Sequence, residues 1–258
     1  MKFSVLASGS KGNSTYLETK EHKVLIDMGT TNKYIENALM ELGVMPSSID
    51  TIFITHDHKD HISALNVFLK KYNPKVYMTS KLKRALDNKI NIKNFVPLES
   101  DFTLEDLKVN VIKTSHDASD SVGFVFESGK SSLVYITDTG YINVKYFELL
   151  KNRSIYIFES NHDVEMLMNG KYRYDLKVRI LSDRGHLSND MSSDYLVSLI
   201  GKNTKYVVLA HLSEENNTVE KAYQTLVNKL EINHIEDKKI LVASQSEVMN
   251  MIEIENHH

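Results

Sequence analysis

The chain of 258 residues contains no cysteine. This absence excludes disulfides, thiol catalysis, iron–sulfur clusters and cysteine-based zinc sites, so any bound metal must take nitrogen and oxygen ligands. Long apolar runs are also missing, since none approaches the roughly 20 residues of a transmembrane helix. The apolar run at the N-terminus is shorter than the roughly 7–15 residues of a secretion signal. We therefore expect a cytoplasmic protein without a membrane partner.

Proline is scarce as well, with only Pro46, Pro74 and Pro97, and no stretch rich in glycine, serine or proline interrupts the chain. Because 41% of the residues are hydrophobic, the chain can bury a large core, and we expect a single domain over residues 1–258. The 31 basic and 34 acidic side chains give a net charge of -3. A polyanion would therefore have to be held by a local patch or by bound metal.

Short β-prone runs alternate with helical patterns along the chain, which indicates an α/β or α+β fold with two β-rich stretches. The first third predicts strands over residues 3–7, 14–17, 23–27 and 51–55, a helix over 31–43, and a further helix that begins after Asp60. The remainder predicts helices near 80–89, 143–151, 175–183, 189–200 and 218–230, and strands near 76–78, 108–114, 121–127, 131–137, 155–158, 205–210 and 239–243.

The most informative stretch is residues 55–61, which read THDHKDH and lie between an apolar strand and an amphipathic helix. In an extended segment His56 and His58 point to the same side, whereas Asp60 and His61 fall in the first turn of the helix. This arrangement fits a site for two metal ions, with imidazoles on one ion, a carboxylate and an imidazole on the other, and a shared water between them. The alternative is a solvated turn with chance histidines, which the placement after a buried strand disfavours.

The pattern H-x-H-x-D-H after an apolar strand resembles the signature of the metallo-β-lactamase superfamily. The resemblance implies a four-layer αβ/βα sandwich, with two mixed sheets and helices on the outer faces. It also implies that His116 completes the first metal site, His211 completes the second, and Asp138 bridges the two ions. Asp27 matches an early aspartate that orients a ligand without binding metal itself. The implied metal ligands are therefore His56, His58, Asp60, His61, His116, Asp138 and His211.

Within this superfamily the chain resembles the YycJ/WalJ (VicX) group of DNA-processing nucleases. A β-lactamase of the common kind needs a cysteine in its second site, and the long nucleases insert a domain where this chain has only 72 residues between Asp138 and His211. The resemblance implies a metal-dependent phosphodiesterase, and specifically a 5′-to-3′ exonuclease that acts on DNA. The motifs that carry it lie in residues 7–14, 158–163, 182–189 and 210–213.

His186 and Glu159 are the further catalytic candidates. His186 precedes the helix predicted from Asn189, whose exposed backbone N–H groups favour an anionic oxygen. The resemblance implies that His186 contacts the scissile phosphate or protonates the leaving oxygen, and that Glu159 orients it. Our hypothesis is that a hydroxide shared by the two metals attacks phosphorus, while Asp60 holds the second metal and takes the proton. Structural roles, such as helix capping for His186, remain the alternative.

Contacts with the substrate are the least specific part of the sequence. The loop after the first strand carries Ser8, Lys11 and Asn13 and could approach a phosphate, although a plain surface hairpin fits the same residues. His162 and Ser188 are further candidates. The densest basic stretch either contacts a nucleic-acid backbone or forms the solvated face of a helix. It consists of Lys81, Lys83, Arg84, Lys89 and Lys93.

Two other functions remain open at this point. One is a small-molecule (cyclic) phosphodiesterase of the same fold without a DNA groove. The other is a non-catalytic metal-binding regulatory protein, which would need a lost ligand, and none is missing. The five imidazoles and two carboxylates suit Zn²⁺ or Mn²⁺, and Fe²⁺ is also compatible. His257 and His258 could bind metal adventitiously or be the remainder of a tag, and we exclude them from the site. The oligomeric state is left open.

Overall fold

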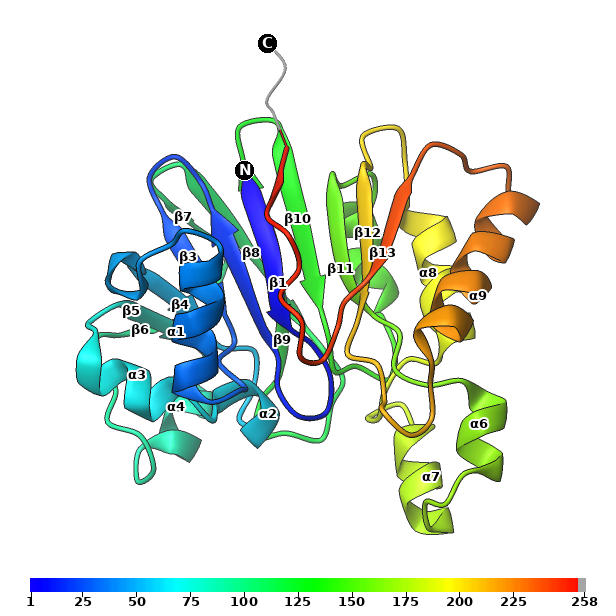
Figure 1. Ribbon diagram of the computed structural model, residues 1–258, viewed down its shortest axis with the longest axis horizontal. Coiled ribbons are helices and arrows are strands. Elements are labelled where there is room, and N and C mark those ends of the chain that lie inside the picture. The colour runs from blue at the N-terminus through cyan, green and yellow to red at the C-terminus, as the bar shows by residue number, and fades with distance from the viewer. Residues whose placement is uncertain (255–258) are drawn as a thin grey trace.

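The computed structural model describes residues 1–254 and contains two seven-stranded sheets that pack face to face (Figure 1). The strand order is β14-β1-β2-β3-β4-β5-β6 in the first sheet and β13-β12-β11-β10-β9-β8-β7 in the second. The first sheet consists of β1 (Lys2–Ala7), β2 (Ser14–Glu18), β3 (Lys23–Ile26), β4 (Thr51–Phe53), β5 (Lys75–Met78), β6 (Phe95–Pro97) and β14 (Ile252–Glu253). The second consists of β7 (Phe102–Leu104), β8 (Leu107–Lys113), β9 (Val122–Ser128), β10 (Ser131–Ile136), β11 (Ile155–Glu159), β12 (Tyr206–Ala210) and β13 (Lys239–Val242).

Both sheets repeat one pairing pattern. In the first sheet β1, β2 and β3 are antiparallel, and β3 to β6 are parallel. In the second sheet β7 to β10 are antiparallel, and β10 to β13 are parallel. Parallel strands end at the same edge of a sheet, and open α/β sheets place their functional side chains at that edge.

Helices cover the outer face of each sheet (Figure 1). The first sheet is covered by α1 (Asn32–Glu41), α3 (Leu65–Lys71) and α4 (Ser80–Leu86), and the second by α5 (Phe147–Leu150), α8 (Asn189–Leu199) and α9 (Val219–Ile232). Three further short helices are α2 (Lys59–Ile62), α6 (Val164–Asn169) and α7 (Tyr174–Ile180), and 3-10 turns span Pro46–Ser48 and Val144–Tyr146. Figure 1 shows α6 and α7 projecting beyond the lower ends of the strands. No helix within residues 1–254 is long and apolar enough to cross a membrane.

The alternation of side chains along each strand builds the layers. Val24 and Ile26 of β3 pack into the core between the sheets, whereas Leu25 packs under the helices. On β11, Ile157 faces the core between the sheets and Tyr156 faces the outer helices. The predicted four-layer αβ/βα sandwich of two mixed sheets is therefore confirmed. The central core draws residues from both sheets.

The helix predicted after Asp60 differs from expectation, because it is split into α2 and α3. The backbone of Met28, just after β3, explains the break: its N–H donates to the carbonyl of His61 at 2.7 Å, and its carbonyl accepts from the N–H of Ala64 at 2.9 Å. Tertiary hydrogen bonds thus replace helical ones and fix His61 against the first sheet. The short elements β6, β7, β14 and α6 were not predicted, since runs of two to six residues carry little periodicity.

Candidate metal centre

The side chains predicted as metal ligands meet where strands of both sheets end. The first sheet contributes one turn, in which His56 and His58 follow β4 and the other two side chains lie in α2. The second sheet contributes one residue from each of three strand ends. These are His116 after β8, Asp138 after β10 and His211 after β12.

The ligand atoms gather in groups that draw on both sheets. The ring nitrogens of His56, His58 and His116 lie within 4.8 Å of one another. The same limit holds for the ligand atoms of Asp60, His61 and His211, although Asp60 and His211 are 151 positions apart in the chain. These are the two sets that the resemblance implied for two ions.

Asp138 lies between the two sets. Its Oδ2 is 3.1 Å from Nε2 of His61, and its Oδ1 is 3.6 Å from Nε2 of His116 and 3.5 Å from Nε2 of His211. Only 2% of the Asp138 side chain is exposed. One buried carboxylate that reaches both sets has the placement that a residue shared by two ions requires.

Hydrogen bonds fix which ring nitrogen of three histidines faces the centre. Nδ1 of His61 lies 2.7 Å from Oδ2 of Asp27, Nδ1 of His116 lies 3.2 Å from the carbonyl oxygen of Gly185, and Nδ1 of His211 lies 3.1 Å from Oε1 of Glu159. Carboxylate and carbonyl oxygens only accept hydrogen bonds, so Nδ1 carries the proton in each ring. The lone pair of Nε2 is then free to bind a metal ion, as in other histidine-ligated sites.

Asp27 is the buried carboxylate of the first sheet. Its Oδ1 accepts a hydrogen bond from the backbone N–H of Thr55 at 2.8 Å, and its Oδ2 accepts from Oγ1 of Thr55 at 2.8 Å and from His61. Asp27 therefore ties β3 to the turn that carries the histidines. This is the orienting contact that the resemblance implied.

Glu159 is its counterpart in the second sheet and is fully buried. Its Oε1 accepts hydrogen bonds from Nδ1 of His186 at 2.8 Å and from His211, and its Oε2 accepts from the backbone N–H groups of Thr139 at 3.0 Å and Leu187 at 3.1 Å. Glu159 and His186 also lie within 4.8 Å of the ligand atoms of Asp138 and His211. Because both oxygens of Glu159 are already used, we assign it to orienting the two imidazoles and not to metal binding.

The electrostatics of the centre favour a bound cation. Burial alone would lower the pKa of His211, but the charge of Asp138 and hydrogen bonds to Asp60 and Glu159 raise it to about 10. Burial opposes ionisation of Asp138 too, yet the charges of His211 and His61 hold its pKa well below the usual range. Without a metal ion, the positive charge of the protonated imidazoles balances the negative charge of the carboxylates. A bound metal ion would balance the same carboxylates.

His56 completes the test of whether the residues fit a metal. Burial, together with the charge of His61, lowers the pKa of His56 well below its ordinary value. Its Nε2 is buried and has no hydrogen-bond partner among residues 1–254. A neutral imidazole with an unused buried lone pair is suited to metal binding. The nitrogen and oxygen donors together fit Zn²⁺, Mn²⁺ or Fe²⁺.

The backbone is unusual at the strand ends that carry these residues. Asp27, Asp138 and His211 have φ angles of 59°, 54° and 57°, in the left-handed region that residues other than glycine seldom adopt. Such conformations cluster at functional sites, where the surrounding structure holds them in place. At Gly29 the backbone packs directly against the carbonyl oxygen of Asp60. A Cβ atom at this position would lie 1.5 Å from that oxygen, so only glycine fits.

The centre opens into a pocket of about 280 Å³. His58, Asp60, His116, Asp138, His186 and His211 form its floor, and Tyr172, Leu176, Arg179 and Ile180 form a wall beside it. These wall residues were not predicted from the sequence. The signal that could have found them is the run Lys171-Tyr172-Arg173-Tyr174, in which basic and aromatic residues alternate as they do on surfaces that bind single-stranded nucleic acid.

The five residues predicted to contact substrate line no part of this pocket. Ser8 accepts a hydrogen bond from the backbone N–H of His211 at 2.7 Å, and Nδ2 of Asn13 lies 3.0 Å from Nε2 of His61. Ser188 is the N-cap of α8, where its hydroxyl accepts from the N–H of Met191. These side chains hold the ligands and the neighbouring helix in place instead.

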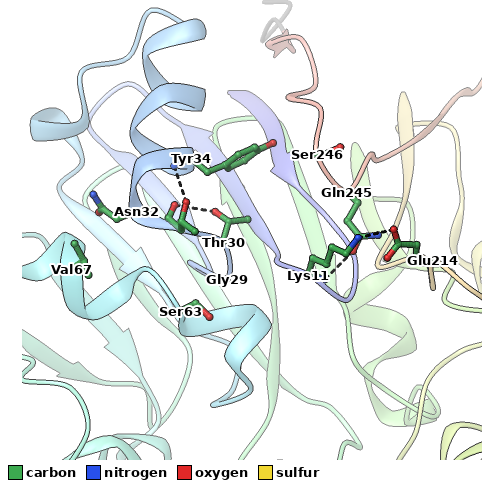
Figure 2. Close-up of a pocket in the computed structure, with 11 residues that line it drawn as sticks. Lys11, Gly29, Thr30, Asn32, Tyr34, Ser63, Val67, Glu214, Gln245 and Ser246 are labelled. Atoms are coloured by element: carbon green, nitrogen blue, oxygen red, sulfur yellow. Dashed lines mark hydrogen bonds and ion pairs between the residues drawn. The ribbon is translucent and has the colours of Figure 1, made fainter.

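His162 and Lys11 also lie elsewhere. His162 is buried, and its Nδ1 lies 3.3 Å from Oδ1 of Asn161. Figure 2 shows Lys11 beside Glu214 and Gln245, across a separate cavity of about 600 Å³ from Thr30 and Tyr34. The Lys11 ammonium pairs with Glu214 at 2.7 Å, so it is already neutralised.

The basic stretch over residues 81–93 lies on and after α4, and none of its side chains lines the pocket. In the structure Lys83 pairs with Asp87 one turn along the same helix surface. This placement agrees with the solvated helix face, which was one of the two readings open from the sequence. The predicted exclusion of His257 and His258 concerns residues outside the described part of the chain.

Comparison with known proteins places the chain in a family. Residues 7–211 match the model of the Metallo-beta-lactamase superfamily, and the chain belongs to this superfamily. The predicted family is thereby confirmed. The crystal structure of the metallo-beta-lactamase fold protein YhfI from Bacillus subtilis has the same fold, with a TM-score of 0.70 at 13% identity over 96% of this chain and 98% of that chain.

Two relatives are similar over most of their length. Exodeoxyribonuclease WalJ of Streptococcus pneumoniae is 39% identical over 236 residues, which cover 89% of this chain and 88% of the relative. Exodeoxyribonuclease YycJ of Bacillus anthracis is 37% identical over 239 residues, which cover 90% and 89%. The predicted similarity to the YycJ/WalJ group is therefore confirmed as well.

Proposed function

We propose that this chain is a metal-dependent exodeoxyribonuclease that holds two divalent ions between its sheets. The observation that carries the proposal is the pair of ligand sets with Asp138 in contact with members of both, beside His186 at one pocket. Relatives that are exodeoxyribonucleases, at 37% and 39% identity over nearly the whole chain, support DNA as the substrate. The 5′-to-3′ polarity of the reaction remains a prediction.

The ions would be held by His56, His58 and His116 in one set and by Asp60, His61 and His211 in the other, and Asp138 contacts members of both sets. Bound divalent ions would supply charge neutralisation for a phosphate and would activate water as a nucleophile.

Two side chains then act on the substrate. The Asp60 side chain is 24% exposed toward the pocket. Burial opposes its ionisation, but hydrogen bonds to His211 and His61 hold its pKa well below the usual range, so it stays a carboxylate that can bind the second metal. That Asp60 also accepts the proton of the attacking water remains a prediction. Glu159 accepts a hydrogen bond from Nδ1 of His186. The other ring nitrogen, Nε2, can then contact a phosphate oxygen or protonate the leaving oxygen.

A small cyclic phosphodiester is the second candidate substrate, because a pocket of about 280 Å³ is narrow. This substrate would bind to the same metal ligands and the same His186. The two candidates therefore differ only in whether the rest of a DNA strand extends beyond the pocket.

A time course on end-labelled DNA separates them. Single-stranded and duplex substrates, with and without a 5′-phosphate, are incubated with Mn²⁺, Zn²⁺ or a chelator, and the Asp138→Ala protein controls for contaminating nuclease. We expect metal-dependent shortening from one end, absent in the variant. Hydrolysis of a cyclic phosphodiester without cleavage of any DNA end would overturn the proposal in favour of the second candidate.

A further inference from the structure

Helix α7 and the bend before it place apolar side chains against the metal pocket. Tyr172, Leu176 and Ile180 line the pocket, and none of the three belongs to a hydrophobic core of residues 1–254. The spacing of four puts Leu176 and Ile180 on one side of the helix, and Tyr172 lies in the bend that precedes it. None of the residues of α7 is buried, and Tyr172 is half-buried. These side chains are therefore not part of the packed interior.

This apolar wall is nevertheless fixed in place. Lys177 Nζ donates to the carbonyl oxygens of Met168 at 2.7 Å and Gly170 at 2.8 Å, which joins α7 to α6. The carbonyl of Ile180 accepts from the N–H of His186 at 3.0 Å, and Arg179 pairs with Asp117, next to His116. The wall is thus held against the catalytic floor from both ends, as a binding surface with a preset geometry requires.

The surroundings of the wall suit a polyanion. Residues 164–184 carry five basic and three acidic side chains, whereas the whole chain has a net charge of -3. Lys171 and Arg184 are exposed and form no ion pair within residues 1–254. Figure 1 shows α6 and α7 beyond the lower ends of the strands, away from the layers of the sandwich. Unpaired cations beside a pocket attract a phosphate backbone.

We infer that the apolar wall binds the base of the terminal nucleotide of the DNA strand, with Tyr172 stacked on the base. This inference rests on the proposed nuclease function and names the part of the substrate that its pocket selects. A polar floor and an apolar wall match the two ends of one nucleotide, its phosphate and its base. The pocket, at about 280 Å³, lies below the roughly 300–1,000 Å³ of sites for drug-sized ligands and has no room for a base pair.

A consequence is that the terminal nucleotide must leave its base pair to reach the floor. Frayed, mismatched or single-stranded ends should therefore be degraded faster than fully paired ends, because the energy needed to unpair the base is smaller. The preference comes from the wall and not from the metal ligands, so substitution of the wall should reduce the difference in KM between paired and unpaired ends.

The test compares strands that end in a normal nucleotide with strands that end in an abasic one. Loss of stacking on one base corresponds to a rise of about 5- to 150-fold in KM for the abasic end. Tyr172→Ala should abolish this discrimination, and Tyr172→Phe should keep it. Tyr174→Ala is the matched control, since Tyr174 is 75% exposed and does not line the pocket. Equal KM values for the two ends with the unaltered protein, or discrimination that survives in Tyr172→Ala, would overturn the inference.

A binding measurement separates failure of this inference from failure of the proposed function. A strand with 2-aminopurine at its end and phosphorothioates in its terminal linkages is titrated with protein, and the fluorescence of the base is followed. Quenching by the unaltered protein and by Tyr174→Ala, but not by Tyr172→Ala, supports binding of the terminal base by the wall. This result would hold even if no DNA were degraded under any metal. Equal quenching by all three proteins would overturn it, as would a change of oligomeric state in Tyr172→Ala, which would make the wall an interface between copies.

Discussion

The two sheets build their parts of the metal centre in opposite ways. The first sheet supplies four side chains from one turn after β4, whereas the second supplies His116, Asp138 and His211 from separate strand ends. All four lie within residues 56–61, and contacts with Met28 and Asp27 hold the turn in place. The dispersed set is complete only when β8, β10 and β12 are paired in register. The ligands of one half are therefore adjacent in the sequence, and those of the other are brought together only by the packing of a whole sheet.

Each half also has its own buried carboxylate. Asp27 holds one imidazole of the first sheet, that of His61, whereas Glu159 holds two imidazoles of the second, those of His186 and His211. A single substitution should consequently cost more in the second half than in the first. The predictions that follow test this difference, from the largest expected effect to the smallest.

Asp138→Ala should have the largest effect, because this carboxylate belongs to both halves. We expect kcat/KM for DNA hydrolysis to fall at least about 10³-fold, equivalent to several kcal/mol of transition-state stabilisation. Steady-state kinetics with saturating Mn²⁺ measure the loss, and circular dichroism checks that the fold persists. Turnover within tenfold of the unaltered protein would show that Asp138 is not shared by the ions.

His186→Ala should reduce turnover by about 10²- to 10⁴-fold, the range for a general acid, while metal content stays unchanged. The imidazole is held by Glu159 and is outside the two ligand sets, so its loss removes a contact with the substrate and not with the ions. Kinetics and elemental analysis are carried out on the same preparation. A parallel loss of metal and activity would instead make His186 a ligand.

Asp27→Asn and Glu159→Gln compare the two halves directly. Loss of an orienting carboxylate lowers metal affinity by about 10- to 100-fold, so we expect this loss for Asp27→Asn. Glu159→Gln should lower metal affinity by a similar factor, because the carboxylate orients the ligand His211. It should also reduce turnover, because the same carboxylate orients His186. Competition with a fluorescent chelator gives both affinities, and steady-state kinetics give turnover. If Asp27→Asn reduced turnover more than Glu159→Gln, the comparison between the halves would be reversed.

Lys11→Ala should have the smallest effect. Its ammonium is exposed, pairs with Glu214 and lies at a separate cavity, and exposed ion pairs contribute about 0–1 kcal/mol. We expect nearly unchanged thermal stability and KM for DNA. A rise in KM of about tenfold or more would instead assign Lys11 to a phosphate contact.

The same division explains how far the sequence could predict the molecule. Strands such as β3 and β11 follow from their apolar runs, and the turn over residues 55–61 carries its chemistry in its own spacing. His116, Asp138 and His211 are each a polar residue after a strand, and such residues are common. Only the resemblance to a family linked them, because their proximity depends on strand order and pairing.

The pocket wall and the supporting side chains could not be predicted in this way. Leu176 and Ile180 have the spacing of an ordinary core-facing helix, and only the tertiary structure shows that they face the pocket. Ser8 and Asn13 lie near the centre in the fold, but they contact His211 and His61 where a substrate contact was expected. The sequence indicated the right loop, and packing decided what its side chains do.

The most direct test of a two-ion centre shared between the sheets is the metal content of three purified proteins. Inductively coupled plasma mass spectrometry after dialysis gives the number of ions per chain. We predict two for the unaltered protein and one each for His58→Ala, which impairs one ligand set, and His211→Ala, which impairs the other. A single ion in the unaltered protein, or two ions retained in either variant, would contradict the account.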